Sequence, residues 1–481
     1  MKLVGYKITF IIFFFYAAAV NGQDDVKTAP MSLEECIDYA LKNNIQVKQS
    51  VLNTELSHIN LVQSEANLLP SLNANASHSY NYGRTIDRFT NQFATQQVLS
   101  QNLSLSSDVT LFSGFQNLNT IQQNKYSYMA GKYDVEKMRN DVALNVASAY
   151  LQVLYASESV EITRNQMGIT QAQVNRTKLL VEAGSAAKGV LLDMQAQLAS
   201  EELTYTSAQN QLDIAYLGLA QLLNLPGTEG FSIVKPDLQI AGETLLAASV
   251  SQIYNSAVSN LPEMKSAEYK VKSSEKAVDV AWGGLSPRLS FSAAYGTGYS
   301  GLSQRVVSLP AYQGYSPNGS FTSGGDTVYS PVFSSAVTEK IPFADQYKDN
   351  VNKSFGFFLT VPVFNRLQTK NAIDRAHIQK LNAELTVEST RLQIQKNVQQ
   401  AYADASAGLK KYAASLKAVE ATKESFKYTE QKFNVGAVNT NDYNESKNRL
   451  VKAESDLLQA KYEYIFKTKV LDFYQGKPLK L

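Results

Sequence analysis

The stretch QKFNVGAVNTNDYNESKNRL, residues 431–450, interrupts a long run of residues with a helical pattern. Gly436 lies within it, and two asparagines, Asn439 and Asn441, follow. Glycine is the residue that most often adopts the left-handed conformation that ends a helix. The stretch therefore predicts a tight turn between two helices, and the helices on either side of it decide the fold.

The helices that lead into this turn, and into a matching turn at Gly184, repeat every seven residues. One heptad position is mostly large: Val146, Val153, Val160, Met167, Val174, Val181 and then Val398, Ala405, Tyr412, Val419, Phe426, Phe433. The position three residues on is small: Ala149, Ala156, Thr163, Thr170, Thr177, Gly184 and then Ala401, Gly408, Ser415, Thr422, Thr429, Gly436. A sustained seven-residue repeat predicts a left-handed supercoil, and small side chains allow a neighbouring helix to come close.

The helices that follow the turns also have a seven-residue repeat of large side chains. Each long helix and the helix that returns from it are therefore expected to form an antiparallel coiled hairpin. These positions are Leu191, Leu198, Tyr205, Leu212, Leu219 and Tyr443, Leu450, Leu457, Tyr464, Leu471. At 1.5 Å of rise per residue, the first long helix would extend for about 100 Å.

The chain also matches itself at two constant offsets, which indicates an internal duplication. At an offset of 217 residues Ala40 meets Ala257, and at 252 residues Gly184 meets Gly436. The sequence thus predicts a first repeat over residues 23–247 and a second over 248–481, each a helix, two strands and a long helical hairpin. The second repeat has an insertion near 301–351, rich in Gly, Ser, Pro and Tyr, which predicts a long exposed loop.

Four segments alternate apolar and polar residues, two in each repeat. They are SLNANASHSYNY (71–82), SQNLSLSSDVTLF (100–112), RLSFSAAYGTGY (288–299) and KSFGFFLTVPVF (353–364). Period two predicts strands with one apolar face, with Leu103, Leu105, Val109 and Leu111 on that face of the second segment. Strands of this length suit a transmembrane β-barrel, and the alternative is the edge of a β-sandwich.

The first 22 residues have the layout of a secretory signal peptide. Lys2 and Lys7 form a positively charged region before an apolar run over residues 8–20. Val20 and Gly22 suit the −3 and −1 positions of the cleavage site. No later run approaches the roughly 18 apolar residues of a membrane-spanning helix. If the chain enters a membrane, we expect it to do so by strands.

Composition disfavours several function classes. A formal net charge of +2 over 481 residues provides no basic field for nucleic acid. The single cysteine, Cys36, permits neither an internal disulfide nor a cysteine metal cluster. The three histidines, His58, His78 and His377, share no ligand spacing. We therefore expect no enzyme activity, no cofactor and no metal site.

Four strands cannot close a membrane-spanning barrel, which needs at least about eight. The chain is therefore expected to oligomerise, and three copies would supply twelve strands continuous with twelve helical rods. Together with the signal peptide, this predicts a tube in the outer membrane of a two-membrane bacterium. A secreted coiled-coil structural protein without a pore is the alternative that remains open.

At this point the sequence resembles the TolC-like outer membrane efflux (channel-tunnel) proteins. The resemblance lies in MSLEECIDYALKNN (31–44), LLPSL (68–72), FNVGAVNTNDYNESKNRL (433–450) and LDFYQGKPL (471–479), and it covers the mature chain. It implies a homotrimer with a twelve-stranded barrel in outer membrane lipid and a periplasmic α-helical barrel. It also implies export through this tube, powered by an inner-membrane pump and linked by a periplasmic adaptor (membrane-fusion) protein.

The resemblance implies two sets of site residues. Asp442 and Glu445, six and nine positions after Gly436, would ring the periplasmic aperture, with Asp193 as a further candidate from the first tip. The same residues also fit a helix start, with Asp442 as N-cap and Glu445 at the capping-box position, and Asp193 also fits a solvated helix face. The tips would contact the adaptor through small and apolar residues: Val181, Gly184, Ser185, Val435, Gly436 and Ala437.

Overall fold

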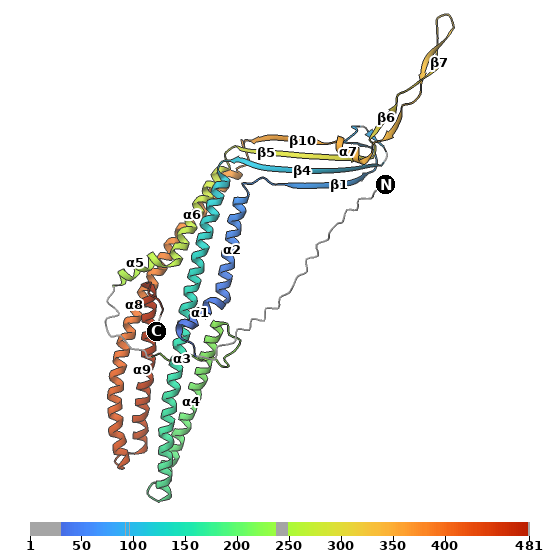
Figure 1. Ribbon diagram of the computed structural model, residues 1–481. Helices are drawn as coiled ribbons and strands as arrows, with labels where there is room; N and C mark the ends of the chain where they lie inside the picture. The colour runs from blue at the N-terminus through green and yellow to red at the C-terminus, as the bar shows by residue number, and fades with distance from the viewer. Residues whose placement is uncertain (1–29, 92, 96, 237–248, 480–481) are drawn as a thin grey trace. The chain divides into compact units, whose positions relative to one another are not determined.

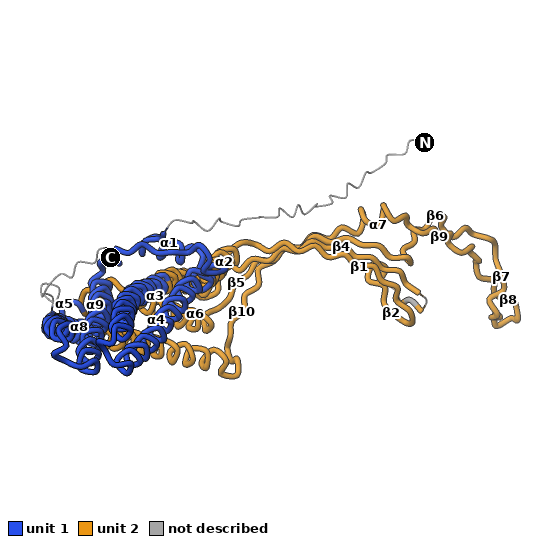
Figure 2. The backbone as a smooth tube through the Cα atoms, turned by 90° about the horizontal axis from the view of Figure 1, so that it is seen from below, with its two compact units in different colours: residues 1–48, 139–253, 398–481 blue, residues 49–138, 254–397 orange. Residues whose placement is uncertain are grey.

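The computed structural model describes residues 30–91, 93–95, 97–236 and 249–479. The predicted signal peptide (1–22) and the predicted repeat boundary (247/248) lie outside the described residues. The chain divides into two compact units (Figure 2). Unit 1 comprises Met1–Lys48, Arg139–Ile253 and Val398–Leu481, and unit 2 comprises Gln49–Met138 and Tyr254–Asn397.

Unit 2 contains a four-stranded antiparallel sheet in the order β1-β4-β5-β10 (Figure 1). The strands are β1 (Asn73–Asn81), β4 (Val98–Ser113), β5 (Arg288–Ser300) and β10 (Asn352–Thr360). All four coincide with strands that the sequence predicted, although β10 ends at Thr360 rather than at Phe364. The period-two pattern therefore located the sheet correctly.

The register of the sheet gathers apolar side chains on one face. Leu105 of β4 lies opposite Ala74 of β1 and Tyr295 of β5, and Phe291 of β5 lies opposite Phe357 of β10. A register shift between Thr110 and Phe112 corrects one prediction: it interrupts the alternation at Leu111, so that Phe112 pairs with Leu289. This apolar face is open in a single chain, where Phe357 is 67% exposed.

The insertion predicted as a loop is exposed, but its residues pair into strands. β6 (Gln304–Ser308) pairs with β9 (Val337–Lys340), and β7 (Tyr312–Phe321) pairs with β8 (Thr327–Phe333), before the short helix α7 (Phe343–Asp349). The glycines and prolines suggested irregular chain, whereas the valines and aromatic residues among them favour extended pairs. A second short pair, β2 (Thr85–Ile86) with β3 (Phe93–Ala94), connects β1 to β4.

Two helices of 67 residues each, α3 (Gln116–Glu182) and α8 (Gln368–Asn434), contribute to both units. In unit 2, α3 packs against α2 (Ile45–Ala66), where a Cβ atom added to Gly131 would lie 3.2 Å from the Thr54 hydroxyl. It also packs against α6 (Pro262–Gly283), where the hydroxyls of Ser127 and Ser273 lie 2.9 Å apart. No helix in the described part of the chain is long and apolar enough to cross a membrane.

Unit 1 holds the ends of α3 and α8 together with α1 (Leu33–Asn43), α4 (Lys188–Leu223) and α9 (Thr440–Tyr474). It also holds the start of α5 (Val250–Asn260), which continues into unit 2 from Tyr254. The predicted heptad positions form its core: Val146, Val153, Val398 and Ala405 are all 0% exposed. On the returning helices Leu219, Tyr443, Tyr464 and Leu471 are buried. The seven-residue repeat therefore identified the buried seam of both hairpins.

Candidate functional site

Both hairpins turn at a glycine in the left-handed conformation, as predicted. Gly184 has φ +67° and Gly436 has φ +73°. The amide of Ser185 donates to the Leu180 carbonyl at 2.8 Å, and that of Ala437 donates to the Lys432 carbonyl at 2.8 Å. These are Schellman turns, which satisfy carbonyls left unpaired at the ends of α3 and α8.

The six residues predicted to contact an adaptor lie at these two turns. Gly184, Ser185, Val435, Gly436 and Ala437 are exposed, and Val181 is half-buried. Val435 has 80% of its surface open to solvent. Both tips thus present small or apolar residues on tight turns.

The alternative role of Asp442 as the N-cap of α9 is wrong. The N-cap is Asn439, whose side-chain oxygen accepts a hydrogen bond from the Asp442 amide at 2.8 Å. Asp442 itself is the third residue of α9, in the first turn, where a carboxylate is favoured by the helix dipole. Glu445 follows one turn later and lies 3.6 Å from the guanidinium of Arg449.

A groove between α4 and α9 brings together two of the three predicted aperture residues. Asp193 and Glu445 both line it, whereas Asp442 is exposed outside the lining. The remaining lining residues are mainly amides and cations: Ala196, Gln197, Asn441, Asn444, Asn448, Arg449 and Lys452. Within one chain, this groove therefore carries two carboxylates and two cations.

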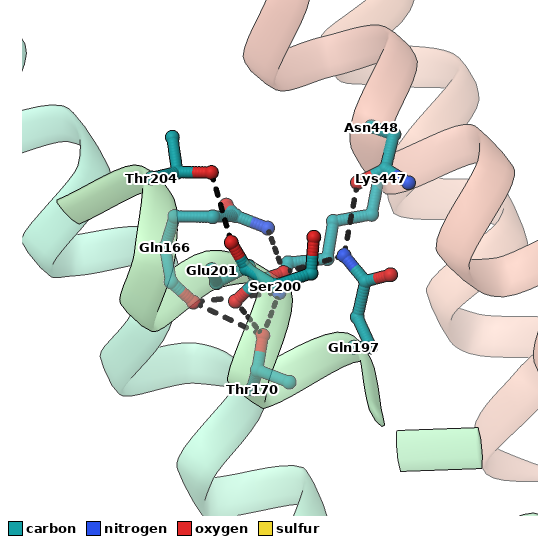
Figure 3. Close-up of polar contacts among 8 residues, drawn as sticks. All are labelled: Gln166, Thr170, Gln197, Ser200, Glu201, Thr204, Lys447 and Asn448. Atoms are coloured by element: carbon teal, nitrogen blue, oxygen red, sulfur yellow. Dashed lines mark hydrogen bonds and ion pairs between the residues drawn. The ribbon is translucent and has the colours of Figure 1, made fainter. Parts of the chain in front are cut away.

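Next to this groove lies a buried polar cluster that the sequence analysis missed (Figure 3). The Lys447 ammonium of α9 lies 3.1 Å from the Glu201 carboxylate of α4, and the two side chains are 2% and 9% exposed. Lys447 also donates to the Thr170 hydroxyl and, at 3.4 Å, to the Gln166 carbonyl, both on α3. The cluster thus joins α9 to both helices of the first hairpin.

The charges in this cluster are well compensated. Burial lowers the pKa of Lys447, while the attraction of Glu201 opposes that shift. Glu201 accepts hydrogen bonds from the Thr170 hydroxyl and from the Gln197 amide, the latter at 2.9 Å. Gln197 also donates to Asn448 at 3.2 Å, so the buried pair is connected to the groove lining.

A positional signal for this cluster exists in the sequence. Glu201 falls three residues after Leu198 and four before Tyr205, and Lys447 falls four residues after Tyr443 and three before Leu450. Residues three and four apart share a helix face, so each charge lies beside an apolar seam. A charged residue at such a position predicts a buried partner, but the period alone does not identify it.

An apolar layer lies nearby in the same unit. Val174 of α3, Met194 of α4 and Tyr443 of α9 are buried together, with Leu191, Leu198, Phe426 and Phe433 packed against them. The rings of Phe433 and Tyr443 stack with centroids 4.5 Å apart. Residues from α3, α4, α8 and α9 therefore meet in one layer. In the described part of the chain, no group of three or more His, Cys, Asp or Glu side chains could hold a metal ion.

Comparison with known proteins identifies the family. The model of the outer membrane efflux protein family matches residues 36–225 and 253–474. The chain belongs to this family. The match includes both helical hairpins and the four strands of the sheet.

Individual relatives agree with this membership. The outer membrane protein TolC of Vibrio cholerae serotype O1 is 21% identical over 434 residues, which cover 90% of this chain and 88% of that protein. The alkaline protease secretion protein AprF of Pseudomonas aeruginosa is 23% identical over 455 residues, covering 91% and 82%. The Campylobacter jejuni CmeC outer membrane channel has the same fold, with a TM-score of 0.74 at 17% identity, covering 93% and 86%.

This chain is thus a TolC-like outer membrane efflux protein. The predicted family, the predicted fold class and the predicted location in the outer membrane, with a large periplasmic part, are confirmed. Its homologues are outer membrane components of efflux and secretion systems, and the family's members are channels rather than enzymes. The names of the relatives indicate different cargoes. AprF serves alkaline protease secretion, whereas OpmQ of P. aeruginosa serves pyoverdine export.

Proposed function

We propose that three copies of this chain assemble into a tube through which cargo leaves the cell. The four-stranded sheet is the observation that carries this proposal. Among the described residues, β1 and β10 each pair with one strand only, which leaves the two outer edges of the sheet open. Three such sheets joined edge to edge would form a twelve-stranded barrel in which every strand has two neighbours.

The open apolar face of the sheet supports a membrane-facing role. Phe355, Phe357 and Leu359 of β10 share this face with Leu103 and Leu105 of β4, and all five are exposed in the single chain. An apolar patch of this kind on a chain without a partner marks a surface that meets lipid or another chain. In a barrel, this face would meet outer membrane lipid.

The hairpin tips are proposed to meet a periplasmic adaptor protein linked to an inner-membrane pump. The exposed Val435 and the small residues around Gly184 and Gly436 support this role. Such turns allow close backbone approach and offer apolar contact area. The cargo class, small molecule or protein, would then be set by the pump.

The aperture of the tube is proposed to lie at Asp442, Glu445 and Asp193. Asp442 and Glu445 lie in the first two turns of α9, and Asp193 lies in the first two turns of α4. Three copies of each carboxylate near one axis would bind cations and oppose the passage of anions. Because Arg449 and Lys452 line the groove that also holds Asp193 and Glu445, we expect a moderate rather than a strict preference for cations.

Assembly is tested by gel migration and fractionation. A trimer should sediment with outer membranes and migrate as a heat-sensitive species that boiling converts to a monomer. A protein that fractionates as a soluble monomer would refute the tube. Deletion of residues 304–340, which removes the paired insertion and leaves the four sheet strands, is the matched control and should preserve the trimer.

The aperture is tested by single-channel conductance in planar bilayers. We compare the wild type with Asp442→Asn/Glu445→Gln and with Asp193→Asn, and use the exposed Glu202→Gln on α4 as the control. Loss of cation selectivity and of block by multivalent cations in the aperture variants alone supports the proposal. Wild-type selectivity in all variants would place the constriction elsewhere.

A further inference from the structure

The two helical hairpins of one chain have the same construction, which makes their pairing ambiguous. Each has a long helix of 67 residues, a Schellman turn and a returning helix, and each has a large-small heptad seam. Seams with the same period can pair in several registers, one heptad or about 10 Å apart. They can also pair with a second copy of the same hairpin.

The buried pair is the feature that distinguishes the two hairpins. Counted from the turn glycines, Glu201 of the first hairpin corresponds to Ala453 of the second. In the same way, Lys447 of the second hairpin corresponds to Gln195 of the first. The first hairpin therefore has only the buried anion of this pair, and the second has only its cation.

The hydrogen bonds around the pair show the same asymmetry. Thr170 and Thr422 occupy equivalent positions on α3 and α8. The Thr170 hydroxyl bonds with both Glu201 and Lys447 (Figure 3). The Thr422 hydroxyl bonds to the carbonyls of Ala418 and Val419 on its own helix. The same residue type thus joins a cluster between hairpins in one case only.

We infer that the Lys447–Glu201 pair specifies how the two hairpins associate: first hairpin with second, in one register. Two copies of the first hairpin paired through this face would bury Glu201 without a cation. A slip of one heptad would bury both charges apart from each other. Each error leaves an uncompensated charge inside the bundle, which is strongly unfavourable.

The apolar layer cannot provide this discrimination. Val174, Met194 and Tyr443 gain from burial against any apolar surface, because burial of apolar area is not directional. A polar pair within such a seam favours one arrangement by penalising the others. This inference concerns assembly of the helices, so it goes beyond the proposed function and does not require the aperture to lie at Asp442 and Glu445.

The test uses cysteine cross-links in a Cys36→Ser background. Ala196 and Asn448 line the same groove, and neither has a bond to Lys447 or Glu201 in the structure. With both replaced by cysteine and a short bis-maleimide added to the purified full-length protein, the wild-type pair should give a cross-link within one chain. Between-chain products through position 196 would report pairing of two first hairpins.

The decisive variant replaces both charges by apolar residues, Lys447→Met/Glu201→Leu. We expect the yield of the within-chain cross-link to fall about tenfold or more and between-chain products to appear. A tenfold fall corresponds to the loss of about 1.4 kcal/mol of preference for the correct pairing. The exchanged pair, Glu201→Lys/Lys447→Glu, should retain most of the wild-type pattern. The exposed pair Lys411–Glu463, which joins α8 to α9 at 2.8 Å, is the matched control for charge removal.

Two results would overturn the inference. One is an apolar-pair variant that folds with the wild-type cross-link pattern, because the charges would then have no role in pairing. The other is an apolar-pair variant that fails to fold while the exchanged pair assembles normally. In that case the pair would stabilise the fold and would not determine which hairpins associate.

Discussion

Gly408 of α8 lies directly against the backbone of Tyr464 on α9. A Cβ atom at position 408 would stand 3.3 Å from the Tyr464 Cα, closer than an ordinary contact. The rings of Tyr412 and Tyr464 stack nearby with centroids 6.4 Å apart. Gly408 is one of the small heptad positions, so the structure shows at this point why a small residue is needed there.

Replacement of Gly408 by valine should therefore separate α8 from α9. Overpacking of a tight contact costs about 1–3 kcal/mol, which outweighs the better helix propensity of valine. Helical circular dichroism should show unfolding at a lower temperature. The matched control is Gly168→Val on α3, where an added Cβ meets nothing within 4 Å, and where we expect no loss. Equal effects at both sites would show that the contact is unimportant.

The features predicted from the sequence are those with a local or periodic signal. The heptads placed Val146 and Val398 in the core, and each tip glycine adopts the left-handed conformation. Period-two alternation found the four strands of the sheet. It failed at Leu111, because a bulge depends on how two strands pair and leaves no mark in the alternation of one strand.

The features that were missed depend on which elements meet. Lys447 and Glu201 are far apart in sequence, and only the approach of α9 to α4 joins them. The pattern of Asp442 and Glu445 also fitted a helix start, but Asn439 is an equally good capping residue, and the backbone of the turn makes Asn439 the N-cap. The strands within residues 304–340 were not predicted, because glycines and prolines occur throughout the two strand pairs and suggested a loop.

Removal of the Lys447 charge alone should destabilise the protein strongly. Lys447→Met leaves the buried Glu201 carboxylate without its cation, which costs about 3–5 kcal/mol. The double variant Lys447→Met/Glu201→Leu should recover most of that loss. Lys411→Met, which breaks an exposed pair, should cost at most about 1 kcal/mol. Denaturant unfolding measures all three, and a single variant as stable as the double one would contradict this prediction.

The Cys36 thiol should not react appreciably with thiol reagents until the protein unfolds. The side chain is 0% exposed, and burial raises the pKa of its thiol from 9.0 to about 12. Maleimide labelling at pH 8 should be slow for the native protein and rapid in denaturant. Because the folded-state pKa is the higher one, the linked stability is complete below pH 9 and is lost as the pH rises toward 12. In Cys36→Ala, this part of the alkaline instability should be absent.

Tyr150 of α3 should hold the chain that follows α4. Its hydroxyl donates to the Val234 carbonyl at 2.6 Å, and the Val234 amide donates to the Met31 carbonyl at 3.0 Å. Tyr150→Phe removes the hydroxyl and leaves that carbonyl without this donor, at a cost of about 1–2 kcal/mol. Hydrogen exchange of the Met31 and Val234 amides should become about tenfold faster, since 1.4 kcal/mol corresponds to that factor. The Ser185 amide at the first tip serves as the internal control, and a uniform acceleration there would indicate global loss of stability instead of local release.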